Sequence, residues 1–261
     1  MLYYDFEYDG VCLSDLGYMV CSFSHENEST LDGSQITFNQ TPIMMGRQHL
    51  LANAKYEECL NSEIDICKID QGDSYISPSE EQEIRRWLSR EKFHKFRPLS
   101  ERYAGIYFIG SFNVQTYEFG GNVIGFHLEF VSDSPFGYMD STYKFDVEQN
   151  GEQIIYDMSD KIGDSYVEMF ITCKASGDLE ITNLFDNRKT IIRNCSEGET
   201  ISMKNPIIES SIEKHDSSIM NDFNFIFPKI SNTYRERKNT YVFSQPCSVV
   251  FKHKELRKIG I

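Results

Sequence analysis

The stretch that decides the fold runs from Ser77 to Asp140: SPSEEQEIRRWLSREKFHKFRPLSERYAGIYFIGSFNVQTYEFGGNVIGFHLEFVSDSPFGYMD. Its first part predicts a helix, because Ser77 suits the N-cap, Pro78 suits the first helical turn and Glu80 stands at capping-box spacing from Ser77. Acidic residues lead and basic residues follow, as the helix dipole favours. An apolar stripe predicts that the helix docks on a sheet through the only tryptophan of the chain; its members are Ile84, Trp87 and Leu88.

After the helix the apolar period changes from 3.6 to 2. Alternation from Ile124 to Phe130 predicts a strand, and Tyr103 to Phe119 supplies the strand before it. Gly120 and Gly121 allow the positive φ of a hairpin turn between them. Helix and hairpin complete an α+β unit that begins with N-terminal strands, and the SPFG segment at 134–137 marks the predicted domain boundary.

The flanking regions read as strands and turns. On the N-terminal side, aromatic or alternating segments predict strands at Leu2–Tyr8, Val11–Phe23, Ile36–Gln40 and Glu63–Asp70, with a polar loop at Ser24–Ser34 and no clear pattern over 44–56. Beyond the boundary no helical pattern is found. Predicted strands there are Thr142–Glu148, Glu152–Met158, Tyr166–Ala175, Leu179–Phe185, Arg188–Cys195, Glu199–Lys204, Asn224–Ile230, Thr240–Ser244 and Cys247–Lys252, which favours a β-sandwich or jelly-roll.

Length and composition favour a mainly β protein of two domains. A chain of 261 residues lies at the upper edge of what one core serves, and 13% aromatic content is typical of strand-rich proteins. We expect an α+β N-terminal domain at 1–138 and a β-sandwich domain at 139–261. The acidic N-terminal stretch MLYYDFEYDG predicts a strand rather than a secretory leader, and no apolar run reaches the roughly 20 residues of a membrane helix.

The charge balance argues against a protein that binds nucleic acid through the phosphate backbone. Lys and Arg total 26 against 40 Asp and Glu, a net charge of -14, whereas neutralising phosphates needs clustered cations. Such a charge mainly provides solubility. A more specific interpretation is that acidic residues line a conduit, so that DNA passes without sticking.

No reactive motif stands out, so the sequence predicts no catalytic, cofactor-binding or metal-binding residues and no cofactor. The histidines lack zinc-ligand spacing, and His127 is expected to face outward; they are His25, His49, His94, His127, His215 and His253. The segment 70–73 resembles a calcium loop only faintly. Seven cysteines without a C-x-x-C motif indicate reduced, mostly buried thiols: Cys12, Cys21, Cys59, Cys67, Cys173, Cys195 and Cys247.

The order of these elements resembles the siphophage distal tail proteins, the baseplate hub rings at the tip of long phage tails. The resemblance covers nearly the whole chain. It rests on the early Leu16-Gly17 after an aromatic strand, the IRRWL helix at 84–88, the long strand Tyr103–Phe119, its partner ending in FVSDSPFGY, and a β-only C-terminal half. The C-terminal half matches only as a strand-rich region.

The resemblance implies a non-enzymatic virion protein that is assembled in the host bacterial cytoplasm. N-terminal domains at 1–138 would form a homo-hexameric ring around the DNA channel, and C-terminal domains at 139–261 would be galectin-like sandwiches. The ring would join the tail tube protein to the tail-tip protein, with the tape-measure protein as a further partner, no specific DNA binding and no membrane insertion. The last residues, about 247–261, return to the ring domain in some members; the basic tail Lys252–Gly260 either does so, meets an acidic neighbour or ends as solvated chain.

Two other functions stay open at this level. A carbohydrate-binding module or adhesin that engages host surface glycans would need an aromatic platform, for which Tyr234 and Tyr241 are candidates, although such residues are more often packed in a sheet. A β-sandwich glycosidase needs only a spaced pair of carboxylates, and chance pairs are expected among 40 acids.

Overall fold

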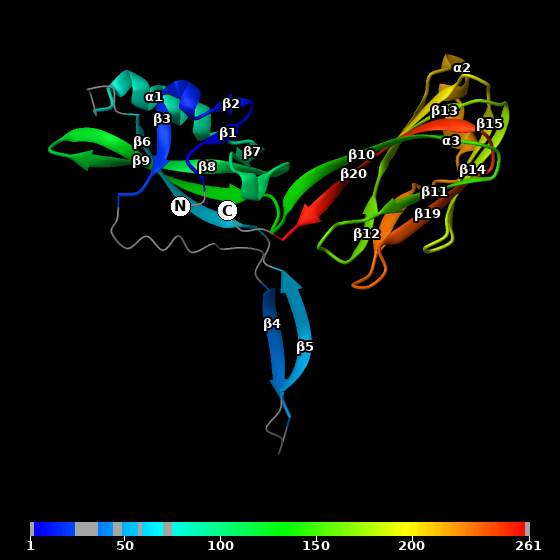
Figure 1. Ribbon diagram of the computed structural model, residues 1–261, viewed down its shortest axis with the longest axis horizontal. Helices are drawn as coiled ribbons and strands as arrows, with labels where there is room; N and C mark the ends of the chain where they lie inside the picture. Colours follow the sequence, from blue (N-terminus) through cyan, green and yellow to red (C-terminus); the bar gives the residue numbers. More distant parts are fainter. Residues whose placement is uncertain (1–2, 24–35, 44–48, 57–58, 70–74, 259–261) are drawn as a thin grey trace. The chain divides into compact units, whose positions relative to one another are not determined.

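The structure is a computed structural model that describes residues 3–23, 36–43, 49–56, 59–69 and 75–258. The chain divides into two units (Figure 1). We call Met1–Tyr138 with Arg257–Ile261 the N-terminal unit, and Met139–Leu256 the C-terminal unit. Most described residues lie in strands, so the prediction of a mainly β fold is confirmed.

The predicted helix forms as α1, Pro78–Leu88. Ser77 Oγ accepts from the Glu80 N–H, and the Glu80 carboxylate accepts from the Ser77 N–H, so the capping box is complete. Ile84, Trp87 and Leu88 are buried as expected. The Trp87 indole N–H donates to the carbonyl of Tyr8 at 3.1 Å, which fixes the helix to the sheet.

The sheet of the N-terminal unit is antiparallel. Its strands lie in the order β3 (Tyr18–Cys21), β6 (Asn61–Lys68), β9 (Asn122–Ser132), β8 (Ile106–Phe119), β7 (His94–Pro98), β1 (Phe6–Tyr8) and β2 (Val11–Cys12). The predicted hairpin is confirmed, with Phe119 opposite Asn122 and positive φ at Gly120 and Gly121. On the helix side, aromatic rings fill the core: Phe6, Phe96, Phe112 and Phe130 make ring contacts between 4.7 and 5.8 Å.

Several N-terminal predictions are wrong in detail. The strand expected over Val11–Phe23 is divided by a 3-10 turn, η1 (Ser14–Leu16), which Gly17 ends with a positive φ. A second 3-10 turn, η2 (Glu101–Tyr103), delays the start of β8, and β7 was not foreseen. Residues without a clear pattern form β5 (His49–Tyr56), the partner of β4 (Ile36–Pro42). The loop predicted at Ser24–Ser34 lies outside the described residues.

The C-terminal unit is a β-sandwich, as predicted. One layer contains β17 (Ile207–Ser210), β16 (Thr200–Lys204), β13 (Glu168–Cys173), β20 (Cys247–Arg257) and β10 (Gly137–Val147), and the other contains β11 (Gly151–Tyr156), β19 (Lys238–Phe243), β14 (Gly177–Asn183) and β15 (Arg188–Cys195), each in that spatial order. β12 (Gly163–Tyr166) pairs with β18 (Lys229–Asn232). Both layers contribute to one core, for example Met169, Ile171, Ile181, Ile192, Phe243 and Phe251.

The connections of the sandwich depart from the order along the chain. β11 pairs with β19, far along the chain, and β13 and β14 belong to different layers. Two one-turn helices, α2 (Glu213–Asp216) and α3 (Ile219–Asp222), contradict the expectation of no helix. The strand expected at Asn224–Ile230 starts only at Lys229, because Asn224 instead bonds through its side chain to the backbone of Lys189 and Ile191 on β15. The basic tail continues β20 as far as Arg257.

Candidate functional site

Strands β4 and β5 form a separate two-stranded sheet, which we call the arm (Figure 1). Every residue of β4 is exposed, and in β5 only Tyr56 is partly covered. An isolated two-stranded hairpin is only marginally stable in water unless another element packs against it. The exposed residues of the arm therefore indicate a sheet that needs a packing partner.

The register of the arm gathers apolar side chains on one face. Partners in an antiparallel pair share a face, and the pairs Ile36↔Tyr56, Phe38↔Ala54 and Gln40↔Leu51 alternate with Thr37↔Lys55, Asn39↔Asn53 and Thr41↔Leu50. The apolar face of the arm is therefore Ile36, Phe38, Leu51, Ala54 and Tyr56, with Gln40 beside Leu51. The register shifts between Asn39 and Gln40, and the exposed Leu50 lies on the opposite face. Phe38 and Leu51 are each 56% exposed. Large exposed apolar side chains gathered on one face are a feature of interaction surfaces.

The root of the arm is fixed at Tyr56. Its ring meets Phe136 edge to face, with the centroids 4.8 Å apart. The ammonium of Lys258 lies 5.0 Å from the centre of the same ring. These two contacts hold the arm at Tyr56.

Most histidines that the sequence singled out are engaged in local contacts. His127 is half-buried rather than fully outward, because its Nδ1 lies 2.8 Å from the Asp65 carboxylate. His94 contacts Asp9 at 3.3 Å, and His49 lies exposed on the arm. Burial lowers the pKa of His253, although nearby Asp157 and Glu255 oppose the shift. His25 and the segment 70–73 lie outside the described residues. Within the described ranges, no group of three or more His, Cys, Asp or Glu side chains could hold a metal ion.

One buried polar cluster escaped the sequence analysis. The Glu199 carboxylate is fully buried and accepts hydrogen bonds from the Ser196 N–H at 2.7 Å and from Ser210 Oγ, while His215 Nδ1 lies against it. His215 Nε2 lies 3.6 Å from Asp222. The turn between β16 and β17 and the helices α2 and α3 bring these groups together, and no sequence motif marks them.

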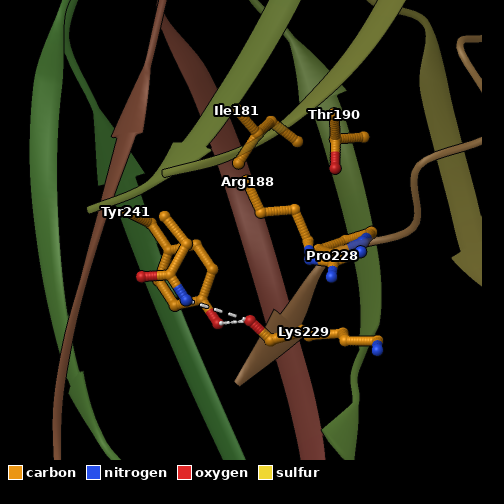
Figure 2. Close-up of a pocket in the computed structure, with 7 residues that line it drawn as sticks. Ile181, Arg188, Thr190, Pro228, Lys229 and Tyr241 are labelled. Carbon is orange, nitrogen blue, oxygen red and sulfur yellow. Dashed lines mark hydrogen bonds between the residues drawn. The ribbon is translucent and has the colours of Figure 1, made fainter. Parts of the chain in front are cut away.

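A recess in the C-terminal unit shows where one of the two candidate aromatics lies. It is lined by Ile181, Asn183, Arg188, Thr190, Pro228, Lys229 and Tyr241 (Figure 2). The Tyr241 hydroxyl donates to the Lys229 carbonyl at 2.7 Å, and the Asn183 amide donates to the same oxygen. The side chains leave no space for a water molecule. Tyr241 is 1% exposed and cannot stack on a sugar, whereas Tyr234 is 81% exposed.

None of the helices in the described part of the chain has the length and apolarity to cross a membrane. Two family models match the sequence. The model described as a phage tail protein N-terminal domain matches residues 1–134, and the model described as a phage tail C-terminal domain matches residues 136–253. No curated protein matches.

Among solved structures, the chain is similar to the crystal structure of the SPP1 Dit (gp 19.1) protein, described as a paradigm of the hub adsorption apparatus in phages that infect Gram-positive bacteria. The TM-score is 0.65 at 12% identity, over 96% of this chain and 98% of that one. At this identity the similarity shows a shared fold.

Proposed function

This chain belongs to the phage tail protein family, whose N-terminal and C-terminal domains together cover nearly all of it, and from that premise we propose that it is a distal tail protein that forms a homo-hexameric ring. The ring surrounds the DNA channel and joins the tail tube protein to the tail-tip protein, beside the tape-measure protein. Its role is structural and not catalytic. The protein assembles in the host cytoplasm and ends in the virion at the tail tip.

The apolar face of the arm is the observation that carries this proposal. A monomer leaves Phe38 and Leu51 in water, and burying such side chains gains about 1.5–3 kcal/mol each. A contact in which the arm of one copy covers a different surface of the next copy is heterologous, and heterologous contacts close into rings when the rotation fits. A repeated arm therefore supports a closed ring of identical subunits.

The net charge of -14 agrees with a DNA channel. The DNA phosphates are repelled by an acidic channel surface and bound by rows of Lys and Arg. The passing genome would then meet no specific binding site.

Replacing two residues on the apolar face of the arm tests the proposal. Native mass spectrometry of the wild-type protein should show hexamers, and negative-stain class averages should show six-fold views. We expect Phe38→Asp with Leu51→Asp to give monomers, because two buried charges would have to be desolvated in each contact.

The matched control carries the same charges on the opposite face, as Asn39→Asp with Asn53→Asp, and should remain hexameric. Circular dichroism should show that both variants are folded. A wild-type protein that stays monomeric at every concentration, with no six-fold views in tail tips, would overturn the ring. A hexameric Phe38→Asp, Leu51→Asp variant would overturn the role of the arm.

A further inference from the structure

His253 and Glu255 are buried where the chain enters and leaves the C-terminal unit. They are 4% and 2% exposed and lie on one face of β20. The chain leaves this unit through β20, after Leu256, and enters it through the neighbouring strand β10, after Tyr138. We call the last residues of β20 and the first residues of β10 the crossing end of the sandwich.

Side chains of β10 pack against both residues. Ser141 Oγ donates to the Glu255 carboxylate at 2.6 Å. The Tyr143 ring lies parallel to the His253 imidazole, with an interplanar angle of 9° and a distance of 6.1 Å between the centroids. Phe251 meets the same imidazole edge to face at 5.7 Å. His253 is thus packed against two aromatic rings.

The imidazole of His253 lacks acceptors for a second proton. Among the described residues, neither Nδ1 nor Nε2 has a hydrogen-bond partner. Oε1 of Glu255 lies 3.8 Å from Nε2, which is beyond hydrogen-bond reach. A protonated imidazole carries a donor at each nitrogen, and a buried charge without hydrogen bonds is costly. The site therefore favours the neutral ring.

The charges around His253 do not reverse this preference. The titratable groups that face it are the Glu255 carboxyl on its own strand, the Tyr143 hydroxyl on β10 and the Asp157 carboxyl after β11. The lysines on either side of His253 are exposed on the opposite face of β20. Burial lowers the pKa of His253 from its ordinary value of 6.5, and the two carboxylates offset this only in part.

The crossing end of β20 extends past its pairing with β13. The last pair in the register of these two strands is Glu168↔Lys252, so His253 lies one residue beyond it. There β10 is the neighbouring strand, and the Leu256 carbonyl accepts from the Asp160 N–H at 2.7 Å. Segments with fewer contacts open at a lower free energy than the centre of a domain.

We propose that uptake of a proton by His253 opens the pairing of β10 with β20 at the crossing end, while the rest of the sandwich stays closed. A histidine whose pKa is lower in the folded state than in the open state takes up a proton on opening. Opening therefore becomes more favourable as pH falls below about 6.5, the pKa of an exposed histidine. The inference concerns the C-terminal unit alone and does not depend on the ring.

Hydrogen–deuterium exchange of the full-length protein, read by mass spectrometry of its peptides, tests the proposal. Exchange is compared at about pH 7.5 and about pH 5, on either side of the histidine range, as protection factors corrected for the intrinsic effect of pH. We expect protection in peptides from 139–147 and 253–257 to fall by up to about tenfold per pH unit, the limit for uptake of one proton. Peptides from β14 and β15 should keep their protection.

Two variants make the assignment specific. His253→Phe keeps a ring against Tyr143 but cannot take up a proton, so its protection should be the same at both pH values. His49→Gln removes an exposed histidine of the arm and should respond as the wild type does.

Three outcomes would overturn the proposal. In the wild type, these are unchanged protection of the β10 and β20 peptides at the lower pH, or an equal loss in the β14 and β15 peptides, which would indicate unfolding of the whole unit. The third is a folded His253→Phe variant that responds as the wild type does. The first two are read without any variant, so they hold even if His253→Phe does not fold.

Discussion

Glu199 is a fully buried carboxylate. Its burial raises its pKa, but hydrogen bonds from Ser210, the Ser196 N–H and His215 together hold the pKa below its usual value. A carboxyl with a lowered pKa contributes stability that is present above its unfolded pKa and is lost as pH falls through the folded pKa. The cluster therefore weakens the C-terminal unit in acid.

Replacing Glu199 with Gln should remove this pH dependence. We expect Glu199→Gln to lower the free energy of unfolding at pH 7 by about 1.5–3 kcal/mol, the range for hydrogen bonds to a charged group. The loss should shrink as pH falls below about 4, where a carboxyl is protonated. Urea unfolding across pH 3–7 measures both effects, with the exposed neighbour variant Glu197→Gln as control. A loss that stays the same at all pH values would contradict this account.

The cluster around Glu199 shows which contacts cannot be predicted from the sequence. Glu199 and His215 are close only because β16 and β17 turn back on each other and α2 follows. Contacts made by tertiary packing leave no spacing pattern in the chain.

At the level of elements, the capping box of α1, which the sequence predicts, affects the pKa of Glu80. The hydrogen bond from Lys68, followed by those around Ser77, lowers the pKa of Glu80 to about 2. The box is therefore intact at neutral pH and fails only in strong acid. Both its members are read directly from the sequence.

Ser77→Ala should destabilise the protein by about 1 kcal/mol, because the Glu80 N–H loses its acceptor at the helix terminus. Ser79→Ala, in the same exposed turn, is the matched control and should be nearly neutral. Urea unfolding midpoints at pH 7 compare the two variants. Equal losses in both would contradict the role of the cap, because Ala favours a helix more than Ser does and propensity alone predicts no loss.

Elements set by local chemistry were predicted correctly, and elements set by distant contacts were not. The Ser77 cap and the Gly120-Gly121 turn specify α1 and the β8–β9 hairpin within a few residues. The residues of β5 that share a face, Leu51, Ala54 and Tyr56, do not alternate strictly, because the register of the arm shifts between the pairs Asn39↔Asn53 and Gln40↔Leu51. The one-turn helices α2 and α3 are too short for a helical period.

At the scale of the whole molecule, we propose that the two units are domains, with a boundary between 138 and 139. Each has its own hydrophobic core, the first built largely on aromatic rings and the second on aliphatic side chains, Cys and Met. Separate cores of this size are what independent folding needs.

A fragment of residues 139–256 should therefore fold alone. We expect a cooperative thermal transition for the fragment within about 10 °C of one transition of the full chain, since a ΔΔG of 1 kcal/mol shifts the midpoint by about 4–8 °C in a domain of this size. Differential scanning calorimetry of both proteins measures this. A fragment without a cooperative transition would show that the C-terminal unit depends on the rest of the chain.

The Tyr56 ring at the root of the arm has a mechanical consequence. The chain passes from one unit to the other after Tyr138 and again after Leu256. Tyr56 is contacted by Phe136, two residues before the first crossing, and by Lys258, two residues after Leu256. The covalent path of a pull on the C-terminal unit runs through these two crossings. Tension along the chain at these crossings would therefore act close to Phe136 and Lys258, the residues that contact Tyr56 at the root of the arm.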